Sequence, residues 1–194
     1  MNARDEILAR TRLGLSAPPV PEAPAGIGFA DPAAMLERFV DRLVDYKAEV
    51  SRCTPDRLAE AVAAALDGVT TVVVPADLPA TWLSGFTGTT TGTATEADAV
   101  VTGCALAVAE TGTIILDAGH TQGRRALSLI PDRHVCVVRH DQVYPDVPEA
   151  VARLTPTRPL TWISGPSATS DIELNRVEGV HGPRRLHVVL VATP

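Results

Sequence analysis

The segment Ala109–Thr113, with the sequence AETGT, places a carboxylate beside two hydroxyl groups and a glycine. Short apolar runs flank it on both sides, so the pattern predicts a β-hairpin whose turn carries Glu110. Such a turn presents the Glu110 carboxylate and the Gly112 backbone N–H to one cleft. The hydroxyl groups of Thr111 and Thr113 would face the same cleft, where these groups suit recognition of a carbonyl or a phosphate. The alternative is that Glu110 only caps the turn.

A longer polar stretch, residues 163–183, separates two expected strands near the end of the chain. Long loops at strand ends in an α/β sheet commonly bind ligands. Ser170 and Asp171 can start a short helix running to Val177, whose first-turn N–H groups would face an anion. The alternative is a surface connection with ordinary capping residues. The candidate site residues of this stretch are Ser164, Gly165, Ser167, Asp171, Glu173 and His181.

Two arginine pairs lie near these stretches, Arg124-Arg125 and Arg184-Arg185. Guanidinium groups suit a carboxylate or phosphate ligand because they can form bidentate hydrogen bonds, although such pairs are equally typical of a solvated surface. Both polar stretches interrupt apolar strands, and neighbouring strand ends converge on shared crevices. We therefore expect residues 109–113 and 164–181 to line one cleft.

The sequence lacks the common motifs of hydrolases and nucleotide-binding proteins: it has no P-loop lysine, no G-x-G-x-x-G after a strand, no G-x-S-x-G and no H-E-x-x-H. Its histidines form no H-x-H or H-x-x-x-H pair, and His134 and His187, in or beside apolar strands, are expected to be structural. Cys53, Cys104 and Cys136 are widely spaced in apolar surroundings, which is typical of buried small residues. We expect no metal site, iron–sulfur cluster or flavin in this chain.

Composition limits the classes of protein to consider. The 194 residues fit one domain, and 17 basic against 23 acidic residues leave no broad cationic surface for nucleic acid. No apolar run exceeds six residues, whereas a membrane helix needs about 20. The N-terminus mixes acids and bases and lacks the apolar stretch of a signal peptide. We expect a soluble cytoplasmic protein.

The periodicity of apolar residues predicts one α/β domain over residues 31–194. Asp31-Pro32 starts a helix that runs to Tyr46, and a strand over 48–53, a helix from Thr54-Pro55 to Gly68 and a β-branched strand over 69–74 form a βαβ unit. That unit favours a parallel sheet with helices on both sides. The further strands expected are 99–101, 105–109, 113–116, 135–138, 160–164 and 186–191, with helical segments at 125–130 and 148–154.

Two other segments are expected to lie outside this framework. Residues 1–30 are predicted to form an N-terminal helix (Asp5–Leu15) and a proline-rich tether. Residues 84–93, rich in glycine and threonine, are predicted to be a flexible loop rather than a nucleotide cradle.

Three blocks of the chain resemble the lactate utilization domain family. They are ADAVVTGCALAVAETGTIIL (97–116), RRALSLIPDRHVCVV (124–138) and ISGPSATSDIELNRVEGVHGPRRLHVVLV (163–191), and they occur in family order. The resemblance implies a three-layer αβα fold with a mixed, largely parallel sheet. That fold is like that of the ribose-5-phosphate isomerase, glucosamine-6-phosphate deaminase and coenzyme A transferase group, here with an N-terminal helical extension.

The same resemblance implies a component of a bacterial complex that oxidises L-lactate to pyruvate. Its partners would be lactate utilization proteins A and B, which carry the iron–sulfur clusters, while this chain would hold no cofactor. Glu110 would be the general base or orienting acid, with Asp171 or His181 as second proton carrier. Arg125 would pair with the substrate carboxylate. Further substrate contacts would come from Thr111, Gly112, Thr113, Ser164, Gly165, Ser167 and Glu173.

Two alternatives to a substrate-handling subunit remain open from the sequence. The first is a non-catalytic assembly or regulatory subunit, which the missing redox motif favours. The second is an independent enzyme acting on a phosphosugar, acyl-CoA or folate-like substrate.

Overall fold

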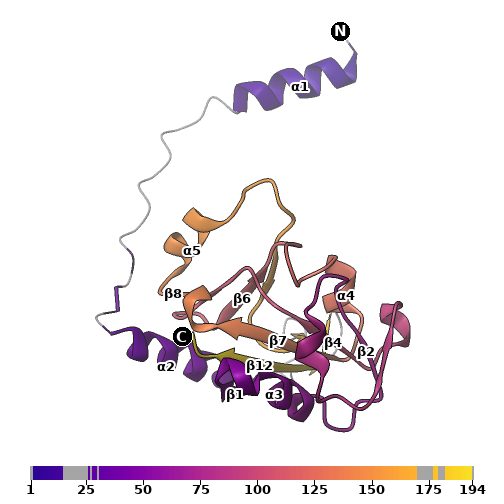
Figure 1. Cartoon of the computed structure of the whole chain (residues 1–194). Coiled ribbons are helices and arrows are strands. Elements are labelled where there is room, and N and C mark those ends of the chain that lie inside the picture. The colour runs from indigo at the N-terminus through magenta and orange to yellow at the C-terminus, as the bar shows by residue number, and fades with distance from the viewer. Residues whose placement is uncertain are drawn as a thin grey trace.

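The computed structural model describes residues 2–14, 26, 28–29, 31–169, 177–178 and 182–193 (Figure 1). The α-helices among them are α1 (Ala3–Gly14), α2 (Pro32–Asp45), α3 (Leu58–Ala65), α4 (Arg125–Leu129) and α5 (Val147–Arg153). The short 3-10 helices are η1 (Pro55–Arg57), η2 (Ala80–Leu83), η3 (Ala94–Glu96) and η4 (His140–Gln142). The strands are β1 (Glu49–Cys53), β2 (Thr71–Val73), β3 (Thr89–Thr91), β4 (Ala99–Thr102), β5 (Leu106–Val108), β6 (Thr113–Leu116), β7 (Arg133–Arg139), β8 (Val143–Tyr144), β9 (Thr161–Ile163), β10 (Ala168–Thr169), β11 (Val177–Glu178) and β12 (Arg185–Val191).

Six strands form a wholly parallel sheet in the order β1-β12-β7-β4-β2-β3. The central strands β12 and β7 pair from Arg185 opposite Arg133 to Val191 opposite Arg139. Their valine-rich sequences are typical of strands covered on both faces. Because all six strands run in one direction, their amino ends lie along one edge of the sheet and their carboxyl ends along the other.

Alternate residues of β7 enter two different cores, because successive side chains of a strand point to opposite faces. Val135 and Val137 pack in a core that includes residues of α3. Cys136 and Val138 point the other way, into a core shared with α2 and the second sheet. The six-stranded sheet thus has helices on both sides (Figure 1), which confirms the predicted α/β class.

The second sheet has four strands in the order β8-β5-β6-β9. β5 and β6 form the expected hairpin, with Val108 opposite Thr113, while β5 runs parallel to β8 and β6 antiparallel to β9. Leu106 and Ile115 face a small core with α5, and Ile114 faces the large core. The mixed pairing expected from the sequence therefore lies in this second sheet.

Helix α2 follows its sequence signals closely. The Asp31 side chain caps it by accepting a hydrogen bond from the N–H of Ala33 at 2.9 Å, and Phe39 and Leu43 are fully buried. In α1, by contrast, every side chain described is exposed, including Ile7 at 64%. In the described part of the chain, no helix has both the length and the apolar character needed to cross a membrane.

Two expectations about loops need correction or restriction. The segment 84–93 is not loop throughout, because Thr89–Thr91 forms the edge strand β3 beside β2, as β-branched residues favour. The helix expected from Ser170 to Val177 falls outside the described residues except for Val177, which lies in β11 and pairs with Thr169 of β10.

Candidate functional site

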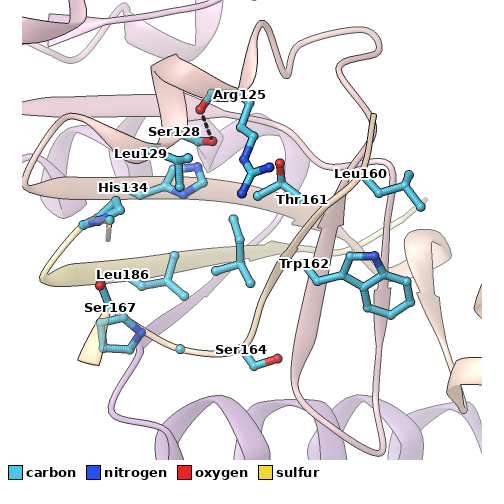
Figure 2. A pocket seen from close by; sticks show the side chains of 15 residues that line it. Arg125, Ser128, Leu129, His134, Leu160, Thr161, Trp162, Ser164, Ser167 and Leu186 are labelled. Atoms are coloured by element: carbon cyan, nitrogen blue, oxygen red, sulfur yellow. Dashed lines mark hydrogen bonds between the residues drawn. The ribbon is translucent and has the colours of Figure 1, made fainter. Parts of the chain in front are cut away.

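A cavity of about 420 Å³ opens at the edge of the parallel sheet where β7 and β12 begin (Figure 2). Helix α4 and strand β9 each contribute to its wall. Its apolar lining includes Leu129, Leu160, Ile163 and Leu186. Its polar lining includes Arg125, Ser128, His134, Thr161, Ser164 and Ser167. Apolar walls with a few convergent polar groups, at this volume, are typical of a small-molecule site.

Arg125 begins α4 and extends its guanidinium group into this cavity (Figure 2). Within the described part of the chain, that group makes no hydrogen bond and no ion pair. The first turn of α4 is held by Ser128 Oγ, which donates to the Arg125 carbonyl oxygen at 3.1 Å. An unpaired guanidinium group beside apolar walls suits a ligand carboxylate, which it can bind through two parallel hydrogen bonds.

His134 combines a structural hydrogen bond with a place in the cavity lining. The residue is only 1% exposed, and its Nε2 lies 2.7 Å from Thr102 Oγ1. The ring also interacts with the buried thiol of Cys136, and His134 lines the cavity. The structural role expected for His134 is present, and the cavity adds a second role that the sequence did not indicate.

A row of small polar groups continues from His134 into the core. Thr102 Oγ1 lies 3.9 Å from Cys136 Sγ, and that thiol lies 3.7 Å from the carbonyl oxygen of Gly103. A hydrogen bond with Cys136, together with burial, raises the pKa of the Cys104 thiol well above its usual value. Cys104 and Cys136 are both buried and free, as expected of small core residues.

Three hydroxyl groups connect the hairpin turn to the cavity. Thr113 Oγ1 lies 2.7 Å from Thr111 Oγ1 and 2.8 Å from Ser164 Oγ. Pairing of β6 with β9 brings the start of one strand beside the end of the other. After Ser164 the chain turns at Gly165, where φ is 86° and a Cβ atom would lie 2.8 Å from the Tyr46 carbonyl oxygen. Glycine is therefore required where the cavity wall meets the end of α2.

The turn that carries Glu110 packs against α2. Arg42 Nε donates to the Glu110 carbonyl oxygen at 3.2 Å, and the Glu110 N–H donates to the Pro145 carbonyl oxygen at 3.1 Å. Gly112, with φ 62°, lies directly against the backbone of α2. The Glu110 carboxylate itself is half-buried and makes no hydrogen bond or ion pair within the described residues. The backbone of the turn is fixed, while its carboxylate stays available.

The structure brings only some of the predicted site residues to the cavity. Arg125, Ser164, Gly165 and Ser167 line it, whereas Glu110, Thr111, Gly112 and Thr113 are linked to it only through the contact between Thr113 and Ser164. Asp171, Glu173 and His181 lie outside the described residues, in a segment whose flanking residues Ser167 and Gly182 both line the cavity.

The second arginine pair, Arg184-Arg185, lies on the protein surface. Arg184 forms an ion pair with Asp132, and Arg185 is exposed at the start of β12. Among the described residues, no three His, Cys, Asp or Glu side chains come together in a way that could hold a metal ion.

Sequence reasoning missed His134, Ser128 and Thr161 as lining residues. Ser128 lies one helical turn after Arg125, so the spacing of the two residues could have indicated a shared face. His134 and Thr161 belong to strands, and only the folded arrangement shows which of their faces meets the cavity.

Residues 87–191 match the LUD domain family, and the chain belongs to this family. "Lactate utilization protein C" of Deinococcus radiodurans is 50% identical over 185 residues, which cover 90% of this chain and 85% of that protein. "Lactate utilization protein C" of Geobacillus sp. (strain WCH70) is 31% identical over 107 residues, 50% of this chain and 44% of that protein. The crystal structure of a DUF162 family protein from Deinococcus radiodurans is similar, with a TM-score of 0.70 and 43% identity, covering 84% of this chain and 99% of that chain. These similarities confirm the family predicted from the sequence.

Proposed function

We propose that this chain acts in lactate utilization as the subunit that binds L-lactate, and that the cavity beside α4 is the substrate site. The observation that carries the proposal is the position of the Arg125 guanidinium group, which points into a cavity of small-molecule size. That group makes no hydrogen bond or ion pair among the described residues. A carboxylate is the ligand group that this arrangement suits best. The names of two relatives, both lactate utilization protein C, support lactate as the source of that carboxylate.

The remaining polar groups would orient the 2-hydroxyl group of L-lactate. His134 and Ser164 are polar residues of the cavity lining, and the Thr111–Thr113–Ser164 hydroxyl chain leads toward the turn that carries Glu110. Glu110 would accept the hydroxyl proton, and Asp171 or His181, as the second proton carrier, would accept the proton that leaves C2. Oxidation of L-lactate to pyruvate releases two electrons and two protons. We assign the electron acceptors to the iron–sulfur partners, lactate utilization proteins A and B.

Calorimetric titration of the isolated chain tests this site directly. L-lactate should bind with a Kd of about 1 mM or tighter, and propionate, which lacks the 2-hydroxyl group, should bind more weakly because it leaves the polar lining unpaired. If L-lactate gives neither binding heat nor a rise in melting temperature, the substrate site is not in this chain.

Replacing Glu110 by glutamine should separate a catalytic role from a structural one. Because the carboxylate has no partner in the described residues, we expect Glu110→Gln to change the free energy of unfolding by no more than about 1 kcal/mol. Loss of the base should lower lactate oxidation by proteins A, B and this variant by roughly 10²- to 10⁴-fold. Melting temperature and reconstituted rate are measured together. A stable variant with full activity would remove Glu110 from the proposed chemistry.

The second candidate function is a non-catalytic assembly subunit. Helix α1 favours it, because Ile7 and Leu8 are both exposed and a partner protein could cover them. If this chain only supports assembly, proteins A and B should keep full lactate oxidation when they are combined with a variant whose cavity side chains are replaced. The Arg125 and Glu110 variants therefore distinguish the two functions.

A further inference from the structure

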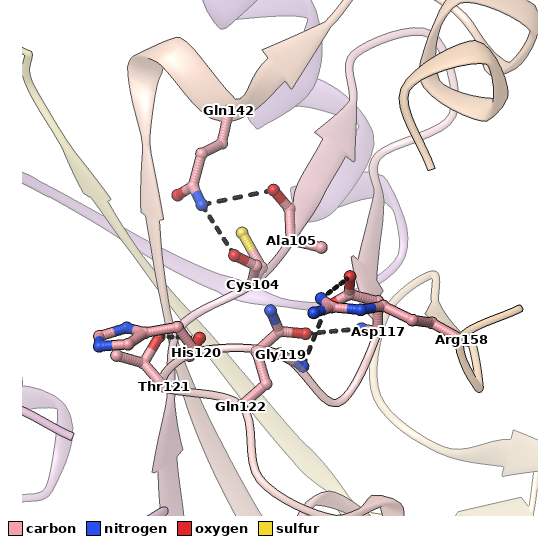
Figure 3. A network of polar contacts seen from close by, with 9 residues as sticks. All are labelled: Cys104, Ala105, Asp117, Gly119, His120, Thr121, Gln122, Gln142 and Arg158. Carbon is pink, nitrogen blue, oxygen red and sulfur yellow. Dashed lines mark hydrogen bonds and ion pairs between the residues drawn. The ribbon is translucent and has the colours of Figure 1, made fainter. Parts of the chain in front are cut away.

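A second cavity, of about 340 Å³, lies at the opposite edge of the six-stranded sheet, where β4 and β7 end. The loop Asp117–Gly123, which follows β6, forms part of its lining (Figure 3). Among the described residues, the two cavities share no lining residue. Ligands of open α/β sheets bind outside the carboxyl ends of the strands, and this cavity occupies that position.

Positive charge predominates in this cavity. Arg139, Arg153 and Arg158 line it together with His120, against the single lining carboxylate of Asp117. The acids that pair with Arg139 and Arg153 are Asp141 and Glu149, and neither belongs to the lining. These two arginine side chains are 55% and 43% exposed, and such exposed ion pairs are weak. An anionic ligand can therefore compete for both guanidinium groups.

The third arginine is anchored more firmly. Arg158 Nη1 lies 2.7 Å from Asp117 Oδ2, and Asp117 also accepts a hydrogen bond from the Gly119 N–H at 3.0 Å. Burial alone would raise the pKa of Asp117, but the ion pair and these hydrogen bonds lower it below its usual value. The carboxylate thus stays charged and holds Arg158 in place at the cavity (Figure 3).

The loop itself is held in a conformation that these residue types rarely adopt. Ala118 has φ 56° and Thr121 has φ 63°, in the left-handed region that favours glycine. The Thr121 N–H donates to Asp77 Oδ2 at 3.0 Å, and its carbonyl oxygen accepts from the Gly103 N–H at 2.8 Å. These bonds fix the backbone directly after His120, whose ring makes no hydrogen bond within the described residues. The exposed His120 side chain is available to a ligand.

We propose that this cavity is a second ligand site, for a small molecule that bears a doubly charged phosphate group. A phosphate dianion can take the place of both Asp141 and Glu149 beside Arg139 and Arg153 without a change in net charge, whereas a monocarboxylate such as lactate can replace only one of them. The three oxygens of a phosphate can also reach more than one guanidinium fork at once. The site is independent of the proposed lactate cavity.

Inorganic pyrophosphate is the probe for this site, titrated calorimetrically into the full chain. We expect saturable binding that Arg153→Gln and Arg139→Gln each weaken by about tenfold to hundredfold, because each change removes a charge-assisted hydrogen bond. Arg10→Gln is the matched control. Arg10 pairs with Glu6 at the same i,i+4 spacing as Arg153 with Glu149, but it lies in α1 and does not line the cavity. Circular dichroism melts establish that all variants fold.

Several results would overturn the second site: no saturation, equal weakening by Arg10→Gln and Arg153→Gln, or citrate binding as tightly as pyrophosphate. Loss of pyrophosphate binding in Arg125→Gln would instead place the anion in the first cavity. Pyrophosphate binding that survives Arg125→Gln and is not displaced by L-lactate supports the second site whether or not the lactate proposal holds.

Discussion

Replacing Arg125 by glutamine is expected to weaken L-lactate binding by about tenfold to hundredfold while leaving the fold intact. A charge-assisted hydrogen bond contributes about 1.5–3 kcal/mol, and glutamine keeps most of the side-chain length without the charge or the bidentate fork. Arg125 is exposed and its side chain makes no hydrogen bond or ion pair among the described residues, so stability should change by no more than about 0.5 kcal/mol. Calorimetry with L-lactate measures the first effect and thermal unfolding the second.

The neighbouring residue provides the control for this prediction. Arg124 is also an exposed arginine, it precedes the same helix, and it does not line the cavity. Arg124→Gln should therefore bind L-lactate as the unmodified chain does. Equal loss in the two variants would mean that overall charge, rather than a site beside α4, attracts the carboxylate.

Gly112→Ala is expected to destabilise the protein by about 2–5 kcal/mol. The left-handed conformation of this residue, at φ 62°, costs an alanine about 1–2 kcal/mol. The new Cβ would also lie 2.9 Å from the Arg42 backbone carbon and 3.0 Å from the Leu43 nitrogen, and a helix backbone cannot move aside as a flexible side chain can. Such overpacking adds about 1–3 kcal/mol. At about 2–4 °C per kcal/mol, the melting temperature should fall by roughly 4–20 °C.

Gly92→Ala is the matched control, because no atom lies within 4 Å of a Cβ placed there and its backbone needs no left-handed conformation. Its melting temperature should stay within about 2 °C of the unmodified protein. If Gly112→Ala melts like Gly92→Ala, the turn that carries Glu110 is not held against α2.

Local sequence signals predicted individual elements well. The Asp31-Pro32 start and the apolar spacing of residues 36–44 indicated a helix to Tyr46, and α2 spans Pro32–Asp45. The β-branched run at 69–74 contains β2, and the glycine turn around Gly112 joins β5 to β6. Each of these features depends on neighbours in sequence, which is why composition and spacing were sufficient.

The division into two sheets could not be predicted in the same way. The hairpin at 105–116 lies in a separate sheet because its two outer edges pair with β8 and β9, which come much later in the sequence. Nothing in the hairpin sequence specifies those partners. The contact between Thr113 and Ser164, 51 residues apart, results from this pairing.

The site was predictable in residue type more than in position. Arginine beside serine and threonine indicated anion binding, but the sequence cannot tell Arg124 from Arg125, because only the start of α4 aims one of them into the cavity. His134 lies in an apolar strand and was expected to be structural. Its access to the cavity depends on which face of β7 meets α4 and β9, and this follows from tertiary packing alone.

Lactate-dependent dye reduction by lactate utilization proteins A and B, measured with and without this chain, tests the proposed substrate role most directly. The proposal predicts that activity requires this chain and that the Arg124→Gln variant supports the full rate. At subsaturating L-lactate, the Arg125→Gln variant should support a rate at least tenfold lower. A full rate from proteins A and B alone, or an equal rate with the two arginine variants, would contradict a substrate site beside α4.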